Sequence, residues 1–424
     1  MTDEAIPRGE DTLLDRLKSK QSFLLFLALA ALAVVPVYAS NGTVVLLAVG
    51  ALAGMTAALA GRLKGFIKSP IGIFLVLFLS WIAFSLAWTI STDDAPWLAF
   101  IMTLLSFVGF AFVAAVRQLG AGPAQTAQNI LLTAAALMIG LFIIEAATGG
   151  VVLKLLGKDA EIILNTVGRG TTILAAFIWP VFALAWARFQ NKSVPVAFLI
   201  GSFVATYLLP VDAAFAALIA GTVTFLAVLA ARRAALAVLF SIFALSIATG
   251  PWLSLNILNP DALAKNGIAV PENRQHRLLI WQFVSSNIAE KPLVGHGFGA
   301  AREIGRSEQQ RYDALQARQA AHLSIHEMRL PLHPHNIPLQ IWLELGAVGI
   351  LFYLGILFGI GRRLWYSTAP PVWIAAAAAG TIAYLSVSLL SFGAWQNWWV
   401  ATAWLAAGLL VLARRTFQSD TTPL

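Results

Sequence analysis

Residues 70–91, PIGIFLVLFLSWIAFSLAWTIS, contain no charged side chain. Such a run can cross a lipid bilayer as a helix, because about 20 apolar residues span the hydrocarbon core. The rest of the 424-residue chain has a similar character, with 59% hydrophobic and 11% charged residues. Since soluble domains carry about 25% charged residues, the composition predicts a protein whose solvent is mainly lipid.

The sequence predicts an all-α fold, a polytopic membrane bundle of about 12 transmembrane helices. The expected spans are residues 22–40, 43–61, 70–91, 96–116, 128–148, 171–187, 194–210, 213–231, 234–254, 338–360, 371–392 and 395–413. The chain then divides into an N-terminal tail, spans 1 to 9, a large loop, spans 10 to 12 and a C-terminal tail, at residues 1–21, 22–254, 255–337, 338–413 and 414–424.

Lys and Arg are concentrated in alternate joints between these spans and in both tails. The residues of this set are Arg8, Arg16, Lys18, Lys20, Arg62, Lys64, Lys68, Arg117, Arg188, Lys192, Arg232, Arg233, Arg362, Arg363, Arg414 and Arg415. The short joints near residues 41, 93, 211 and 394 contain neither Lys nor Arg. Because cytoplasmic loops are enriched in Lys and Arg, we expect both termini in the cytoplasm and the large loop in the periplasm. Much of the net charge of +8 then serves to orient the spans in the membrane. We therefore expect no nucleic-acid partner.

The loop at 255–337 contains all six His of the chain. Loops of this length are more often functional than linking. Residues 272–290 predict an amphipathic helix, and the glycines at 295–299 predict a flexible turn after it. Residues 301–329 are polar and are expected to be mainly helical. The segment His333-Pro334-His335-Asn336 stands at the mouth of the tenth span.

Two motifs flank this loop. The pattern His-Asn-x-x-Leu-Gln-x-x-x-Glu-x-Gly-x-x-Gly runs from His335 to Gly349, and Arg277-x-x-x-Trp281 precedes Pro292-Leu-Val-Gly-x-Gly297. These motifs, with the span count and the place of the loop, resemble the O-antigen ligase and polymerase superfamily (Wzy_C type), whose fold is GT-C-like. The family commonly has a Ser-Arg pair where an outer joint enters the bundle. The corresponding stretch here, residues 209–213, lacks the Arg.

The resemblance implies a membrane glycosyltransferase of lipopolysaccharide biosynthesis in the inner membrane of a Gram-negative bacterium. The expected donor is a polysaccharide on undecaprenyl diphosphate. The acceptor is a lipid A–core sugar hydroxyl for a ligase, or the next repeat unit for a polymerase. The reaction is expected to need no metal and no cofactor. A secondary transporter is a second alternative, although no pair of interrupted spans repeats in two halves as transporters often require.

The diphosphate leaving group needs cationic hydrogen-bond donors, and the planar fork of Arg suits it. Arg277 is the first candidate because it lies in the family-like motif. Arg274, at i−3, shares its helix face. Arg169 stands at the outer mouth of the sixth span. Each could instead be a solvated or interfacial Arg.

The acceptor hydroxyl needs a general base, most often His. His335 is the first candidate, and His333 could replace it or orient the acceptor. Asn336 and Gln340 could bind sugar hydroxyls or only cap and pair. Glu344, inside a span, could orient an active-site residue or only lock two helices together.

Two further patterns allow other interpretations. His322 and His326 have the i, i+4 spacing of zinc ligands, with His333 and His335 close by, but the chain lacks a His-Glu-x-x-His motif. Trp395, Trp398 and Trp399 at an outer helix end predict an aromatic belt at the membrane interface.

Overall fold

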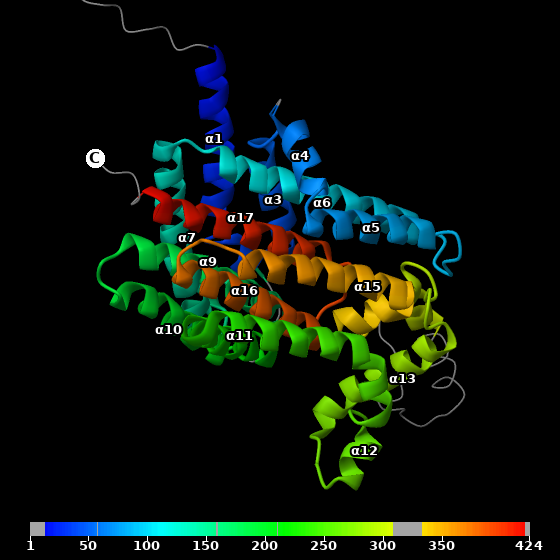
Figure 1. The fold of residues 1–424 in the computed structure, drawn as a ribbon. Helices are drawn as coiled ribbons and strands as arrows, with labels where there is room; N and C mark the ends of the chain where they lie inside the picture. The colour runs from blue at the N-terminus through cyan, green and yellow to red at the C-terminus, as the bar shows by residue number, and fades with distance from the viewer. Residues whose placement is uncertain (1–12, 57, 158–159, 210, 308–332, 420–424) are drawn as a thin grey trace, which may run out of the picture.

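The computed structural model describes residues 13–56, 58–157, 160–209, 211–307 and 333–419 (Figure 1). Across these ranges the chain forms helices and no strand. The all-α prediction is therefore confirmed for the described part of the chain.

Seven helices in the described ranges are long and apolar enough to cross a membrane. They are α6 (Ala95–Gln118), α7 (Ala121–Thr148), the Thr166–Arg188 part of α9 (Ala160–Arg188), α11 (Asp212–Asn256), α15 (Ile337–Trp365), α16 (Pro371–Leu390) and α17 (Asn397–Ser419). Two more helices, α4 (Leu59–Ile67) and α5 (Pro70–Ser85), qualify together and meet at 87°. A polytopic helical membrane protein is confirmed, and the count of 12 spans stays a prediction.

Shorter helices lie within or between the other predicted spans. They are α1 (Leu13–Ala31), α2 (Val35–Tyr38), the 3-10 helix η1 (Ser40–Gly42), α3 (Thr43–Leu52), α8 (Val151–Leu155) and α10 (Ser193–Tyr207). The apolar part of α1 is residues 22–31, and α3 with η1 covers 40–52. These helices fall short of the length that a single unbroken span requires.

Helix α11 combines two of the predicted spans, 213–231 and 234–254. Its backbone leaves the helical region at Ala231 (φ −146°, ψ 64°). Arg232, just beyond, bonds to carbonyls at the C-terminal end of α15, whereas Ile247 accepts a bond from Trp342 near the start of α15. The second half of α11 therefore runs antiparallel to α15.

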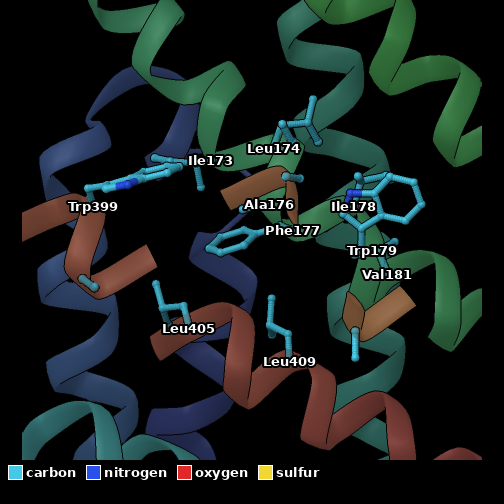
Figure 2. Close-up of a cluster of buried hydrophobic side chains, with 14 of the residues drawn as sticks. Ile173, Leu174, Ala176, Phe177, Ile178, Trp179, Val181, Trp399, Leu405 and Leu409 are labelled. Atoms are coloured by element: carbon cyan, nitrogen blue, oxygen red, sulfur yellow. The ribbon is translucent and has the colours of Figure 1, made fainter. Parts of the chain in front are cut away.

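The core is centred on α9. In the most apolar stretch of its Thr166–Arg188 part, 89% of the residues are buried. Figure 2 shows Ile173, Phe177 and Trp179 of this helix in one buried cluster with Leu405 and Leu409 of α17. A helix that is apolar on every side can be surrounded by other helices or by lipid, and the high burial of α9 shows that helices surround it. On α16, the small side chains of Ala375 to Ala379 are all buried, which allows the close approach typical of membrane helices.

Basic side chains cap the helices that end at one end of the bundle. Arg415 donates to the carbonyls of Val116, Arg117 and Leu119 at the end of α6. Arg232 does the same at the end of α15, and Lys192 at the end of α9. These carbonyls lack partners within their own helix and carry partial negative charge. The joints that the sequence groups by their positive charge thus share this capping role.

The opposite end carries the large loop (Figure 1). It contains α12 (Pro260–Lys265), α13 (Glu272–Glu290) and a helical stretch at 300–307. The predicted helix at 272–290 is confirmed, and Ile280, Val284 and Ile288 form its buried face. The prediction of helix at 301–329 holds for 301–307, and the remainder lies outside the described residues.

Candidate active site

The motif helix α15 is broken at Gly346, where the backbone takes φ 64° and ψ −166°. Residues 292–297 pair with the break: Ala347 N donates to Pro292 O, His296 N to Leu343 O and Gly297 N to Glu344 O, each at 2.9 Å. Buried backbone groups freed by a helix break need such partners. The predicted span at 338–360 corresponds to α15, and at its break the loop replaces the missing helical bonds.

The glycines of this loop allow the close approach. Gly295 and Gly297 have φ of 70° and 92°. A Cβ at Gly295 would lie 2.5 Å from the Glu344 carbonyl carbon, and one at Gly297 would lie 2.3 Å from Thr89 Cα. Residues 295–300 are all buried. The predicted turn at 295–299 is present and buried, because the absent side chains let the backbones pack closely.

Glu344 is fully buried in the described structure and joins three segments. Its carboxylate accepts bonds from Gly299 N at 2.6 Å, Trp395 Nε1 at 2.7 Å and Gln340 Nε2 at 2.9 Å. A buried carboxylate is costly unless it has partners of this kind. The contacts favour the helix-locking interpretation of Glu344 over direct contact with substrate.

Asn336 and Gln340 lie on the same face of α15, at i−8 and i−4 from Glu344. Asn336 Oδ1 accepts from Leu339 N at 3.0 Å as the helix N-cap, and its Nδ2 donates to Leu389 O at 3.0 Å. Gln340 Oε1 accepts from Ala394 N at 2.8 Å. Both side chains are buried, so these contacts favour capping and pairing over sugar binding.

Trp395, before α17, and Trp398 and Trp399, in its first turn, do not form the predicted aromatic belt. Trp398 is 5% exposed and Trp399 is fully buried. Trp399 Nε1 donates to Ser388 Oγ at 3.2 Å, and Trp395 Nε1 to Glu344. A belt residue places its N–H at the headgroups, whereas these N–H groups have partners inside the protein. This prediction is therefore wrong.

Residues 333–336 form the turn that leads into α15, and α13 holds it in place. Trp281 Nε1 donates to Pro334 O at 3.0 Å, and Arg277 Nη1 donates to Leu390 O at 2.8 Å. The i, i+4 spacing puts Arg277 and Trp281 on one face of α13. The motif Arg-x-x-x-Trp thus positions its Arg beside the His turn.

His335 is held in an uncommon backbone conformation, with φ of 51°. Non-glycine residues adopt this left-handed region rarely, and when they do it is often at functional sites. Its ring lies 4.4 Å from the ring of His333, centroid to centroid, and is partly exposed. Within the described residues neither ring nitrogen has a hydrogen bond, so both remain available.

His333 supports the turn. Its Nδ1 accepts from His335 N at 3.3 Å, and its Nε2 lies 3.2 Å from Gln396 Nε2. Among the described residues Gln396 Oε1 has no partner. A neutral His whose Nδ1 accepts carries its proton on Nε2. Rotating the Gln396 amide places its oxygen opposite that proton and satisfies both groups.

Burial and nearby cations favour the neutral form of both rings. Burial, together with the smaller effect of the charges of Arg302 and Arg169, lowers the pKa of His333 to about 4. Burial, together with smaller contributions from His333, Arg277 and His276, lowers the pKa of His335 to about 3. Both rings are therefore neutral at pH 7 and able to accept a proton.

Arg169 reaches this site from α9. Its side chain is exposed and lies within electrostatic range of His333. The preceding Gly168 packs on Val211, since a Cβ there would lie 3.0 Å from Val211 Cγ2. Arg169 therefore stands next to residues 209–213, where the family's Arg is missing.

Arg302 and His276 belong to the same group of charges, and the sequence interpretation missed both. Arg302 Nη1 lies 3.8 Å from Asp94 Oδ2, and Arg306 Nη2 lies 2.6 Å from the same oxygen. The position of His276 beside Arg277 was a usable signal. Nothing in the sequence connects Arg302 with His333, because the packed loop at 295–299 creates that proximity.

Other predicted residues cannot be placed. The side chain of Arg274 and the residues His322 and His326 lie outside the described part of the chain. Within the described part, no group of three His, Asp or Glu side chains is arranged to hold a metal ion.

Comparisons with known proteins agree with the motifs. The Wzy_C family model, described as O-antigen ligase, matches residues 196–354, which contain α13, the His turn and the first part of α15 with its break. Three curated relatives named "Putative polysaccharide ligase" come from Rickettsia. The Rickettsia typhi protein is 25% identical over 349 residues, 80% of each chain. The Rickettsia felis protein is 25% identical over 374 residues, which cover 87% of this chain and 86% of the relative.

The Rickettsia prowazekii protein is also 25% identical, over 301 residues that cover 69% of this chain and 70% of the relative. The family match includes both motifs that flank the large loop. The family match and these relatives support assignment of the chain to the O-antigen ligase superfamily.

Proposed function

We propose that this protein is an O-antigen ligase that moves a polysaccharide from undecaprenyl diphosphate to a lipid A–core sugar hydroxyl. The observation that carries the proposal is the His turn. The ring of His335 has no hydrogen bond within the described residues, its backbone has a positive φ, and Arg277 lies within electrostatic range of it. A proton acceptor beside positive charge suits the transfer of a sugar from a diphosphate to a hydroxyl.

In the proposed reaction the acceptor oxygen attacks the anomeric carbon of the donor sugar. The bond from that carbon to the diphosphate oxygen breaks, and undecaprenyl diphosphate leaves with the electron pair. His335 accepts the proton of the acceptor hydroxyl. His333 positions His335 by accepting its backbone N–H.

Arg277 and Arg169 are the proposed diphosphate ligands. Arg277 uses one nitrogen on Leu390 O, and a guanidinium has five N–H donors, so several remain for phosphate oxygens. Arg169 is exposed and has no ion pair within the described residues. Arg302 and Arg274 are further candidates for the same anion.

The charges couple the donor to the base. Burial is the main cause of the lowered pKa of His335, and the positive charge of Arg277 adds to it. A bound diphosphate offsets this positive charge, which raises the pKa of His335. The base thus gains proton affinity when the donor is in place.

The proposed setting is the inner membrane of a Gram-negative bacterium, with 12 spans and both termini in the cytoplasm. The loop 255–337 and the His turn then face the periplasm. The charge pattern of the joints supports this orientation. The shared capping role of Arg232, Arg415 and Lys192 at the opposite end from the His turn is consistent with it.

Gene deletion followed by gel analysis of surface polysaccharide tests the proposal. Free lipid A–core together with long chains retained on the carrier is the expected result. Core that carries a single repeat unit would instead indicate a polymerase using the same donor. An unchanged pattern would exclude both.

A further inference from the structure

Four arginines from four helices lie together at the end of the bundle opposite the His turn. They are Arg62 of α4, Arg117 of α6, Arg363 of α15 and Arg414 of α17, and we name them the arginine cluster. Arg117 lies within electrostatic range of the other three. Arg62, Arg117 and Arg363 are exposed, and Arg414 is partly buried.

No acidic side chain balances this charge within the described part of the chain. None of the four arginines is in an ion pair there, since the ion pairs join Asp94 and Glu303 to Arg302 and Arg306. Every Asp or Glu whose side chain is described belongs to the other end of the bundle or to its loop: Asp93, Asp94, Glu145, Asp212, Asp261, Glu290, Glu303 and Glu344.

Carbonyls and a ring hold the cluster in place instead. Arg62 Nη1 donates to Ala114 O at 3.3 Å, and Arg414 lies 5.4 Å from the ring centroid of Trp373. Helix C-termini add only about half a negative charge each, and Arg415 already occupies the last carbonyls of α6. Arg117 and Arg363 therefore remain uncompensated by protein within the described structure.

The position of α4 places the cluster at the membrane surface. This helix meets α5 at 87°, so it lies across the ends of the spans, as interfacial helices do. Its Leu59 is buried, and Ile67 is 40% exposed beside Lys68. Arg62 thus lies at the depth of lipid headgroups, level with the ends of α6, α15 and α17.

We propose that the arginine cluster binds the phosphate of an anionic phospholipid headgroup in the adjoining leaflet. Guanidinium groups pair phosphate oxygens in a planar fork. Basic pockets between membrane helices are suited to such headgroups. The depth of the cluster and the exposed apolar Ile67 favour a lipid over a soluble anion. The inference does not depend on the proposed glycan transfer.

Thermal unfolding of the purified full-length protein in a nonionic detergent tests this site. Phosphatidylglycerol is added in one arm, phosphatidylcholine in a second and inorganic phosphate in a third. A lipid that binds only the folded state raises the apparent Tm, here by about 3 °C for phosphatidylglycerol alone. The double variant Arg117→Gln/Arg363→Gln should lose at least half of that shift.

The matched control is Arg188→Gln/Arg233→Gln. It removes the same charge from exposed arginines at the same end of the bundle, outside the cluster, and should keep the full shift. If the test variant fails to fold, the single substitution Arg363→Gln replaces it, because that exposed side chain has no hydrogen bond or ion pair within the described residues.

Three results would overturn the assignment. Equal loss of the shift in both double variants would indicate general attraction to a basic face. An equal shift with inorganic phosphate would indicate a soluble anion. Residues 2–12 contain Asp3, Glu4, Glu10 and Asp11. If the lipid raises the Tm only after these residues are removed, the arginine cluster binds the chain's own N-terminal segment instead.

Discussion

The indole N–H of Trp281 donates a hydrogen bond of 3.0 Å to the carbonyl oxygen of Pro334. This bond joins α13 to the turn that carries His335. Arg277 lies one helical turn before Trp281 and bonds to Leu390 O. The distance between the proposed diphosphate ligand and the proposed base therefore depends on how α13 docks on the turn.

Replacing Trp281 with Phe tests this dependence. The ring volume is largely kept and the N–H is lost, which costs about 1 kcal/mol of stability for one hydrogen bond. We expect the rate of glycan transfer to fall about tenfold or more, because small errors in position are costly in catalysis. Trp97→Phe is the control, since Trp97 is 65% exposed and forms no hydrogen bond within the described residues. Equal rates in both variants would contradict the positioning role.

The variant His335→Asn tests whether His335 is needed for transfer without disturbing the fold. Asn tolerates positive φ better than most residues, so the turn should keep its conformation, but Asn cannot accept a proton at neutral pH. We expect transfer to fall at least 100-fold, the contribution typical of a general base, with an unchanged apparent Tm. Near-normal transfer by purified His335→Asn protein would remove His335 from the mechanism.

Glu344→Gln should destabilise the fold. Three N–H donors point at the carboxylate, and an amide would turn its NH₂ group toward at least one of them. The expected cost is about 2–4 kcal/mol, measured as a lower Tm in detergent.

Glu145→Gln is the matched control for this substitution. Glu145 accepts from Tyr38 and Val152 through Oε1, and its Oε2 has no partner within the described residues. An amide should therefore fit there at a cost of about 1 kcal/mol or less. Equal destabilisation at both positions would contradict the locking role of Glu344.

Gly346→Ala should prevent correct docking of the loop at 292–297. A Cβ at Gly346 would lie 2.3 Å from Leu293 O, and its φ and ψ are open essentially only to Gly. We expect loss of folded protein after solubilisation. Gly140→Ala in α7 has open space around the new Cβ and should be neutral or stabilising, because Ala favours helix. Similar yields of the two variants would count against this account.

The pH dependence of transfer follows from the burial of His335, to which the nearby charge of Arg277 adds. Its pKa is lowered to about 3, and the base acts in its neutral form, which is present above that value. Because kcat/KM reports the free enzyme, it should stay flat from pH 8 to about pH 5, whereas an unperturbed His titrates near 6.5. The acid limb of kcat should lie at higher pH, since the bound diphosphate raises the pKa. Half-loss of kcat/KM near pH 6.5 would argue against this environment.

Much of the architecture could be predicted from composition and pattern. Long apolar runs predicted the helices, and the helix at 272–290 agrees with α13 at both ends. The break at Gly346 could not be predicted, because the residues on either side are apolar and helix-compatible. Only the pairing with 292–297 makes a non-helical conformation favourable there.

The candidate site, too, could be predicted from the sequence only in part. Arg277, His333 and His335 could be selected from local motifs, and Arg169 from its place at a helix mouth. Arg302 could not, since its proximity to His333 arises from a loop folded over Glu344. The tryptophans at 395–399 were misinterpreted, because hydropathy cannot tell an interfacial Trp from one whose N–H has a partner inside the bundle.

By itself, the sequence determined that lipid is the solvent, that the chain is helical, which joints carry the positive charge and which short motifs hold the polar residues. These properties depend on residue type and local spacing. The tertiary structure alone decided which polar groups satisfy one another. Buried polar groups must find partners wherever the folded backbone brings them, and here Glu344, Gln340 and Asn336 are used inside the protein while His335 is left available.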